Sequence, residues 1–290
     1  MREELEQLLT GIRDLKKSGL DSLHIQESTL TEFENALKSV QAESAPTSPD
    51  KRAVKQAPVV ETTTEKDLTS EPEIKVPEFT IPEGSKQEKW EWLRDRVLNC
   101  EKCNSHVKPG KKVVFGVGNI DADIFFCGEA PGQEEEIQGE PFVGPAGQLL
   151  TKIIQTTGLQ RSDVYIGNIM NWRPETDTPY GNRPPTQEEM AYCLPYLKAQ
   201  VEIVQPKLIV ALGATAVNGL LGYDRSRSIT KCRGNWYEFA GTPTIITFHP
   251  SYVLRNGSMQ IKRQIWEDML SVMEKLSMSI SDKQRAFFTK

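Results

Sequence analysis

From about residue 87 onward, short apolar runs alternate with longer segments whose apolar positions recur at helical spacing. Four runs have the length and content of buried strands, namely residues 123–127, 164–167, 207–212 and 244–248. The helical segments span roughly residues 146–158, 187–204, 213–221 and 259–276. Strands that alternate with helices in this way usually pair in parallel, with helices on both faces of the sheet. The pattern therefore predicts an α/β fold with three α/β/α layers around a central, mostly parallel four-stranded sheet.

The first 86 residues follow a different pattern. Residues 1–41 carry apolar side chains at helical spacing, among them Leu5 and Leu8, and predict short amphipathic helices. Residues 42–86 are rich in Pro, Ser, Thr, Glu and Lys, and we interpret them as a disordered linker. The globular domain is expected at residues 87–280. Two short helices cannot bury their apolar faces alone, so the N-terminal segment is either a marginally stable extension or a docking segment for a protein partner.

The composition is typical of a globular protein. Of 290 residues, 38% are hydrophobic and 26% are charged. No apolar run is long enough to span a membrane, and the N-terminus lacks the layout of a signal peptide, so we expect a cytoplasmic protein with no membrane partner. Five cysteines are too few for a disulfide framework in a chain of this length. The pair Cys100 and Cys103 is then a metal half-site, a redox pair or neither.

The net charge of −5 is unevenly distributed. Residues 1–86 hold 11 basic and 17 acidic residues, which leaves 24 basic and 23 acidic residues in the rest of the chain. The expected globular domain is thus nearly neutral. A protein that scans DNA can rely on a local basic strip, so the charge neither supports nor excludes a nucleic-acid partner.

Three loops that directly follow expected strands concentrate the polar chemistry. The small residues of Gly128–Gly132 allow a ligand to approach the backbone closely. The amide of Asn168 can donate and accept hydrogen bonds at once, and His249 directly follows the last strand. Each feature alone also fits a purely structural role, as a turn, a cap or a surface histidine. The carboxyl ends of parallel strands lie at one edge of a sheet, so the three loops are expected to lie close together there. Their proximity favours a binding site at that edge.

Five segments in this order carry a family resemblance: GEAPGQEEEIQGEPFVGPAGQLL, VYIGNIMNWRP, KLIVALGATA, SITKCRGNWYEF and TFHPSYVLRN. They are similar to those of the uracil-DNA glycosylase superfamily, above all to its family 4, the iron–sulfur-containing bacterial and archaeal branch. The resemblance covers about residues 95–275. It implies a monomeric bacterial hydrolase that flips uracil out of single- or double-stranded DNA and cleaves its N-glycosidic bond. The abasic site that remains would start base excision repair.

The resemblance also implies which residues form the uracil pocket. Phe142 stacks on the uracil ring, and Asn168 reads the uracil edge and rejects cytosine. His249 is the main catalytic residue, because it donates a hydrogen bond to uracil O2 as negative charge builds on the leaving base. A donor of this kind is typically worth ~3–4 kcal/mol. Backbone groups of Glu129 and Ala130 line the pocket.

The carboxylates of the first motif differ from those of the best-known branch of the superfamily. That branch has an Asp that supports the attacking water, and Ala130 occupies the matching position here. Glu129 and Glu135 are the carboxylates that the resemblance places nearest, and we expect them to have a supporting catalytic role. The alternative is that they belong to a solvated acidic loop at residues 134–136.

The last motif is expected to contact DNA. By resemblance, Val253, Leu254 and Arg255 enter the minor groove and fill the gap that the flipped nucleotide leaves. Pro250 and Ser251 are expected to lie near phosphates.

Family 4 resemblance also raises the question of a [4Fe–4S] cluster, which four Cys thiolates hold in that branch. Cys100, Cys103 and Cys193 match three of the ligands, and Trp172 stands at the fourth position. Three thiolates can hold a cluster with one open iron, for which His106 is a substitute ligand in principle. Alternatively, the ring of Trp172 fills the volume of the cluster. Both alternatives remain open at this stage.

The resemblance also allows a second function, in which the protein binds or covalently traps uracil in DNA without turnover. Some superfamily members bind uracil in DNA or trap it covalently, and those that cross-link carry a nucleophilic histidine after the second motif. Residues 175–189 contain no histidine, which favours hydrolysis with turnover.

Overall fold

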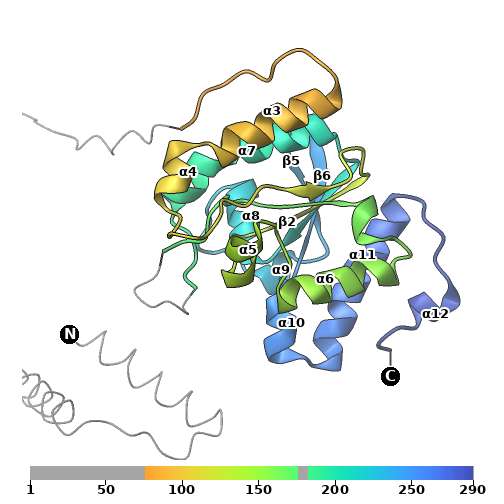
Figure 1. The fold of residues 1–290 in the computed structure, drawn as a ribbon. Coiled ribbons are helices and arrows are strands. Elements are labelled where there is room, and N and C mark those ends of the chain that lie inside the picture. The colour runs from red at the N-terminus through yellow and green to blue at the C-terminus, as the bar shows by residue number, and fades with distance from the viewer. Residues whose placement is uncertain (1–75, 176–181, 290) are drawn as a thin grey trace, which may run out of the picture. The chain divides into compact units, whose positions relative to one another are not determined.

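The computed structural model describes residues 76–175 and 182–289 (Figure 1). The amphipathic helices expected at residues 1–41 and most of the linker expected at residues 42–86 lie outside this part of the chain. Within it, Phe79 and Ile81 already pack against the hydrophobic core. The packed chain thus begins earlier than residue 87, where the sequence pattern placed the start of the domain.

A mixed sheet forms the centre of the described structure, with the strand order β1-β3-β2-β4-β6-β5. Its strands are β1 (Val117–Gly118), β2 (Ile124–Gly128), β3 (Tyr165–Asn168), β4 (Leu208–Leu212), β5 (Trp236–Phe239) and β6 (Thr242–Thr247). The four inner strands are parallel to one another, and β1 and β5 pair antiparallel at the two edges. The predicted α/β class and the parallel arrangement are confirmed. The four expected strands are the inner four, and the two edge strands were not predicted.

The helices in the described residues cover both faces of the sheet (Figure 1). They are α3 (Lys86–Leu98), α4 (Glu101–Ser105), α5 (Gln133–Gln138), α6 (Pro145–Thr156), α7 (Gln187–Val204), α8 (Ala214–Leu221), α9 (Ile229–Cys232), α10 (Pro250–Asn256), α11 (Met259–Lys275) and α12 (Asp282–Arg285), with a 3-10 turn at Arg161–Asp163. No helix in this part of the chain has the length and apolar character needed to cross a membrane.

The sheet separates two layers of hydrophobic core. Successive side chains of each inner strand point to opposite faces of the sheet, so they enter the two layers in turn. Phe125 and Ile209 belong to the core beneath α3, α7 and α8. Their neighbours Phe126 and Val210 belong to the core beneath α6 and α11. Strands buried on both faces are apolar throughout, which explains why the sequence shows them as continuous apolar runs.

The two longest helices on one face begin with well-defined caps. Ser85 accepts a hydrogen bond from the backbone N–H of Glu88 and starts α3, and Thr186 does the same with Glu189 at the start of α7. In both cases the glutamate returns a bond to the capping residue, which forms a capping box. These caps set the positions where α3 and α7 begin, on the side of the sheet that carries Cys100 and Cys193.

Candidate active site

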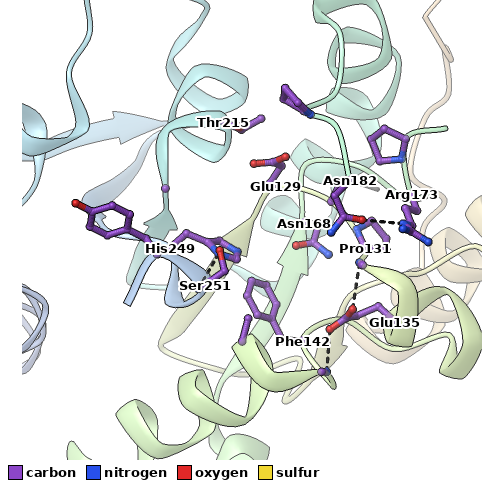
Figure 2. A pocket seen from close by; sticks show the side chains of 18 of the residues that line it. Glu129, Pro131, Glu135, Phe142, Asn168, Arg173, Asn182, Thr215, His249 and Ser251 are labelled. Atoms are coloured by element: carbon purple, nitrogen blue, oxygen red, sulfur yellow. Dashed lines mark hydrogen bonds between the residues drawn. The ribbon is translucent and has the colours of Figure 1, made fainter. Parts of the chain in front are cut away.

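A cavity of about 610 Å³ opens where the parallel strands end. Its lining includes Glu129 after β2, Asn168 at the end of β3, Gly213 after β4 and His249 after β6 (Figure 2). The loops that the sequence placed at one sheet edge therefore meet in a single cavity. This is the position expected for a ligand site in a parallel α/β sheet.

The wall that carries Phe142 is shaped by one carboxylate. Glu135 Oε1 accepts hydrogen bonds from the backbone N–H groups of Val143 and Gly144, each at 3.0 Å, and Oε2 accepts one from Gly132 at 3.1 Å. The bond from Gly132 caps the start of α5, and the bonds from Val143 and Gly144 tie the chain directly after Phe142 to this helix (Figure 2). Phe142 itself has a φ of 55°, a left-handed conformation that is costly for a bulky residue and needs such support.

The lack of a side chain at Gly128 brings Asn168 and Phe142 together. A Cβ at this position would lie 2.4 Å from Asn168 Oδ1 and 2.4 Å from Phe142 Cζ, so an alanine does not fit without movement. Gly128 and Asn168 are register partners in β2 and β3. The parallel ladder therefore fixes the amide beside the aromatic ring (Figure 2).

Asn168 presents an unused hydrogen-bond acceptor. The residue is 6% exposed, and its Oδ1 has no hydrogen-bond partner among the described residues. A buried polar atom without a partner costs stability, so such an atom is commonly found where a ligand completes it. The position of this oxygen against Phe142 marks the floor of the cavity as a binding surface.

His249 closes the cavity opposite Asn168 (Figure 2). It precedes the first residue of α10, and its Nδ1 accepts a hydrogen bond of 3.1 Å from the backbone N–H of Ser251. Ser251 Oγ lies 2.8 Å from the same nitrogen. Burial, together with the positive charge of Arg255, lowers the pKa of His249 to about 4. The ring is thus neutral near neutral pH, and its single proton resides on Nε2 because Nδ1 is an acceptor.

The rings of His249 and Phe142 lie 5.6 Å apart between centroids, with an angle of 34° between their planes. A flat heterocycle stacked on the ring of Phe142 would therefore have the imidazole of His249 at the edge of the heterocycle. The site can hold an aromatic ring by stacking and address that ring from two sides with hydrogen-bonding groups.

Glu129, together with Glu134 and Glu135, is one of three carboxylates among the described residues that line the cavity. Burial raises the pKa of its side chain, while a hydrogen bond with Thr215 and the charge of Arg255 act in the opposite direction. Thr215, at the start of α8, also lines the cavity. This threonine could not be recognised from the sequence, because nothing in its spacing shows that α8 starts beside Glu129.

Two further residues of the cavity wall were missed from the sequence. Arg173 Nε donates to Asn182 Oδ1 at 2.9 Å, and Arg173 Nη1 donates to the buried carboxylate of Glu136 at 3.0 Å. Both Arg173 and Asn182 line the cavity. The arginine lies within the second motif, but its partner Asn182 is nine residues further along the chain, and the sequence pattern does not reveal that the two meet.

The helix α10 divides the expected DNA-contacting residues into two groups. Leu254 is 52% exposed and Arg255 is also exposed. Val253 is 6% exposed and packs in a core cluster with Phe248 and Ile265. The expectation that Val253 enters a DNA groove is therefore wrong, because the helical turn directs it into the protein. Pro250 is buried as well, and Ser251 is half-buried beside His249.

The expected cluster ligands gather at one place away from the cavity. Cys100 caps α4 and Cys103 lies within it, while Cys193 lies in α7. Cys103 and Cys193 both lie in the same buried core cluster, and a hydrogen bond to Cys193 together with burial raises the pKa of the Cys103 thiol. The fourth position holds Trp172, which is 1% exposed.

The donor set does not fit a cluster that needs four thiolates. The indole of Trp172 carries only an N–H donor and offers no lone pair to iron. Cys127 is buried in β2 and Cys232 ends α9, so neither supplies the missing thiolate. Among the described residues, no group of three or more Cys, His, Asp or Glu side chains is arranged to hold a metal ion.

Comparison with known proteins agrees with the geometry of the cavity. The family model described as the uracil DNA glycosylase superfamily matches residues 115–270. A type-4 uracil-DNA glycosylase of Thermotoga maritima is 45% identical over 186 residues, which cover 64% of this chain and 93% of that protein. Type-4 uracil-DNA glycosylases of Archaeoglobus fulgidus and Saccharolobus solfataricus are 37% and 39% identical, over 66% and 64% of this chain and 94% and 85% of theirs. The chain belongs to the uracil-DNA glycosylase superfamily.

Proposed function

We propose that this chain is a monofunctional uracil-DNA glycosylase that removes uracil from DNA and leaves an abasic site, the first step of base excision repair. Membership of the superfamily and the names of its type-4 relatives support this function. The observation that carries the proposal is the unpaired, buried Oδ1 of Asn168 beside the ring of Phe142. A base inside a duplex cannot reach such a buried site, so the target nucleotide must flip out of the stack.

Asn168 and Phe142 together account for recognition of uracil. The free Oδ1 of Asn168 accepts a hydrogen bond from uracil N3–H, and its amide N–H group donates to O4. Cytosine has an acceptor at N3 and an amino donor at position 4, so its pattern is inverted and leaves both groups unpaired. Buried unpaired groups are expensive, and a site of this kind discriminates strongly between the two bases. Phe142 supplies the flat surface on which the base stacks.

His249 stabilises the leaving base. When the bond between C1′ and N1 breaks, its electron pair moves onto uracil and spreads to O2. The neutral imidazole donates its Nε2–H to O2, while Nδ1 is held by the backbone N–H of Ser251. Because this donor is already oriented, it needs no reorganisation as the charge develops.

Glu129 is the carboxylate that supports the attack of water. The C1′ centre becomes positively charged as uracil departs, and the water oxygen then bonds to C1′ while its proton is released. Both Glu129 and Glu135 line the cavity, but the carboxylate of Glu135 is committed to three backbone N–H groups. We therefore assign Glu129 to the water or the sugar cation and Glu135 to positioning of the Phe142 loop.

Leu254 and Arg255 are the groups that contact DNA. Both are exposed on α10, directly beyond His249. An apolar side chain can occupy the space that the flipped base vacates, and a guanidinium can pair with a phosphate. In this proposal the contacts to the duplex lie beside the entrance of the pocket.

The assay for this function uses a labelled oligonucleotide with a single uracil, incubated with the full chain and then treated with alkali. Strand cleavage at more than one event per protein molecule supports hydrolysis with turnover. A protein–DNA band that survives denaturation would instead show covalent trapping. The absence of both products with the wild-type chain would contradict the proposal, and an oligonucleotide with cytosine in place of uracil is the matched control.

A further inference from the structure

The place where family 4 resemblance implies an iron–sulfur cluster is built differently in this chain. Three segments converge there: α4 with Cys100 and Cys103, the loop after β3 with Trp172, and α7 with Cys193. Figure 1 shows α4 lying beside α7 at one end of the described structure. Something must hold these segments together, because they are far apart in the sequence.

Trp172 occupies the centre of this region. Its ring stacks in parallel on the ring of His106, with 4.8 Å between centroids and 9° between planes. On another side, Tyr192 of α7 lies 6.1 Å from it at an angle of 60°. The indole thus connects the residue after α4 with α7 through ring contacts, and it is almost completely buried.

The thiols also have partners within the protein. Cys100 Sγ lies 3.3 Å from the hydroxyl of Tyr192 and accepts a hydrogen bond of 3.4 Å from the backbone N–H of Cys103. Cys103 and Cys193 are both fully buried in the same core cluster. The contacts that stabilise the region are therefore the thiol–hydroxyl contact of Cys100, apolar packing and aromatic contacts.

The indole nitrogen of Trp172 is buried and lacks a hydrogen-bond partner among the described residues, which fits a tryptophan that stands where relatives with a cluster have a cysteine ligand. A tryptophan selected for an ordinary core position usually finds a partner for this group when it is buried. The ring of Trp172 fills the space in this region, although its Nε1–H group is left without a hydrogen bond among the described residues.

We propose that Trp172 takes the place of an iron–sulfur cluster in this chain, so that the mature protein is metal-free. In this account the stack of His106, Trp172 and Tyr192 joins α4, the loop after β3 and α7. The three cysteines are then structural thiols. The proposal does not depend on the glycosylase activity, since metal content and folding are measured without DNA.

The test compares the full-length wild type with Trp172→Cys, which restores the fourth thiol. Both are purified without oxygen and incubated with iron and sulfide, and bound iron, zinc and visible absorbance are measured. Cys193→Ser in the wild-type background serves as the control. We expect the wild type to be colourless, with metal at the level of the control, and Trp172→Cys to gain iron and thiolate-to-iron absorbance. Stoichiometric iron or zinc in the wild type that Cys193→Ser removes would overturn the proposal.

A folded Trp172→Cys protein that takes up no iron would also overturn the proposal, since Trp172 would not then be what excludes the cluster. Where Trp172→Cys does not fold, the wild-type metal content decides. Thermal melting of Trp172→Phe and Trp172→Ala tests the structural part independently. We expect the phenylalanine variant to melt close to the wild type and the alanine variant clearly lower. Equal melting of all three would contradict a stabilising role for the ring.

Discussion

The backbone N–H of Ser251 donates a hydrogen bond of 3.1 Å to Nδ1 of His249. A backbone N–H can only donate, so Nδ1 must carry a lone pair and the proton of the neutral ring must be on Nε2. Protonation of the ring would destroy this hydrogen bond in a buried position. The short helix α10, which begins directly after His249, therefore determines the state in which the histidine faces the cavity.

The first prediction concerns the protonation of His249. Because burial lowers its pKa to about 4, we expect no titration of this ring near the ordinary histidine value. Nitrogen NMR of the full chain should show a neutral ring protonated at Nε2 near neutral pH. The ring should gain its second proton only as the pH approaches about 4, whereas the excision rate also follows the protonation of the Glu129 carboxyl, whose pKa burial raises. A ring protonated at Nδ1, or a charged ring at neutral pH, would refute the assignment.

The second prediction concerns the loop that carries Phe142. In Glu135→Gln one acceptor oxygen becomes an N–H donor and the charge is lost, so the side chain can no longer accept from all three backbone N–H groups of Gly132, Val143 and Gly144, and the bonds that remain are weaker. Hydrogen bonds to a charged group are worth about 1.5–3 kcal/mol, so we expect excision to fall at least about tenfold. Glu134→Gln is the matched control, because Glu134 is exposed on the same helix. Equal activity of the two variants would show that Glu135 does not position the loop.

Much of the fold could be predicted from the sequence, and the reasons are physical. Strands buried on both faces, such as β2 and β4, are continuous apolar runs and are easily recognised. The edge strand β1 has two residues, and β5 is only partly buried, so neither leaves a clear apolar run. The loops of the site could be located because each follows an inner strand.

The individual roles within those loops could not all be predicted. The role of Glu135 depends on the chain folding back so that Val143 and Gly144, eight and nine residues later in the sequence, contact its carboxylate. The inward direction of Val253 depends on the start of α10 at Pro250, since a helix of this phase buries Val253 and exposes Leu254. Both facts belong to the tertiary structure and have no signature in residue spacing.

The third prediction separates these two neighbours on α10. Val253→Ala removes buried apolar volume and should lower the free energy of unfolding by about 1–3 kcal/mol. Leu254→Ala, at an exposed position, should leave thermal stability unchanged and weaken excision from duplex DNA more than from single strands. Melting curves and rates on both substrates distinguish the variants. The reverse pattern, with Leu254→Ala unstable and Val253→Ala active but defective on duplex DNA, would contradict the structure.

The fourth prediction concerns a buried ion pair behind the His249 loop. Asp268 accepts hydrogen bonds from Thr247 Oγ1 at 2.6 Å and from Arg233 Nη2 at 2.7 Å, and burial raises its pKa to about 6. The folded protein then holds this proton more tightly than the unfolded chain does. The stabilising effect of the bound proton is complete below about pH 4 and is lost as the pH rises through about 6.

Asp268→Asn should remove this dependence, because an amide does not titrate. In chemical unfolding at several pH values, the stability of the wild type relative to the variant should fall by up to about 3 kcal/mol across this window; the opposite contribution of His249, which both proteins share, cancels in this difference. The comparison uses the slope with pH, so it holds even where the variant is less stable overall. Parallel slopes for the two proteins would show that Asp268 does not titrate in this range.

The most direct test of the whole account is the rate of uracil release under single-turnover conditions, measured for the wild type and for His249→Ala on the same oligonucleotide. Loss of one preorganised donor to the developing negative charge typically costs about 10²–10³ in rate. Free uracil should appear with the wild type, and its release should slow by about that factor in the variant, measured at a temperature where melting curves show both proteins folded. Release by His249→Ala within a few-fold of the wild type would contradict the account.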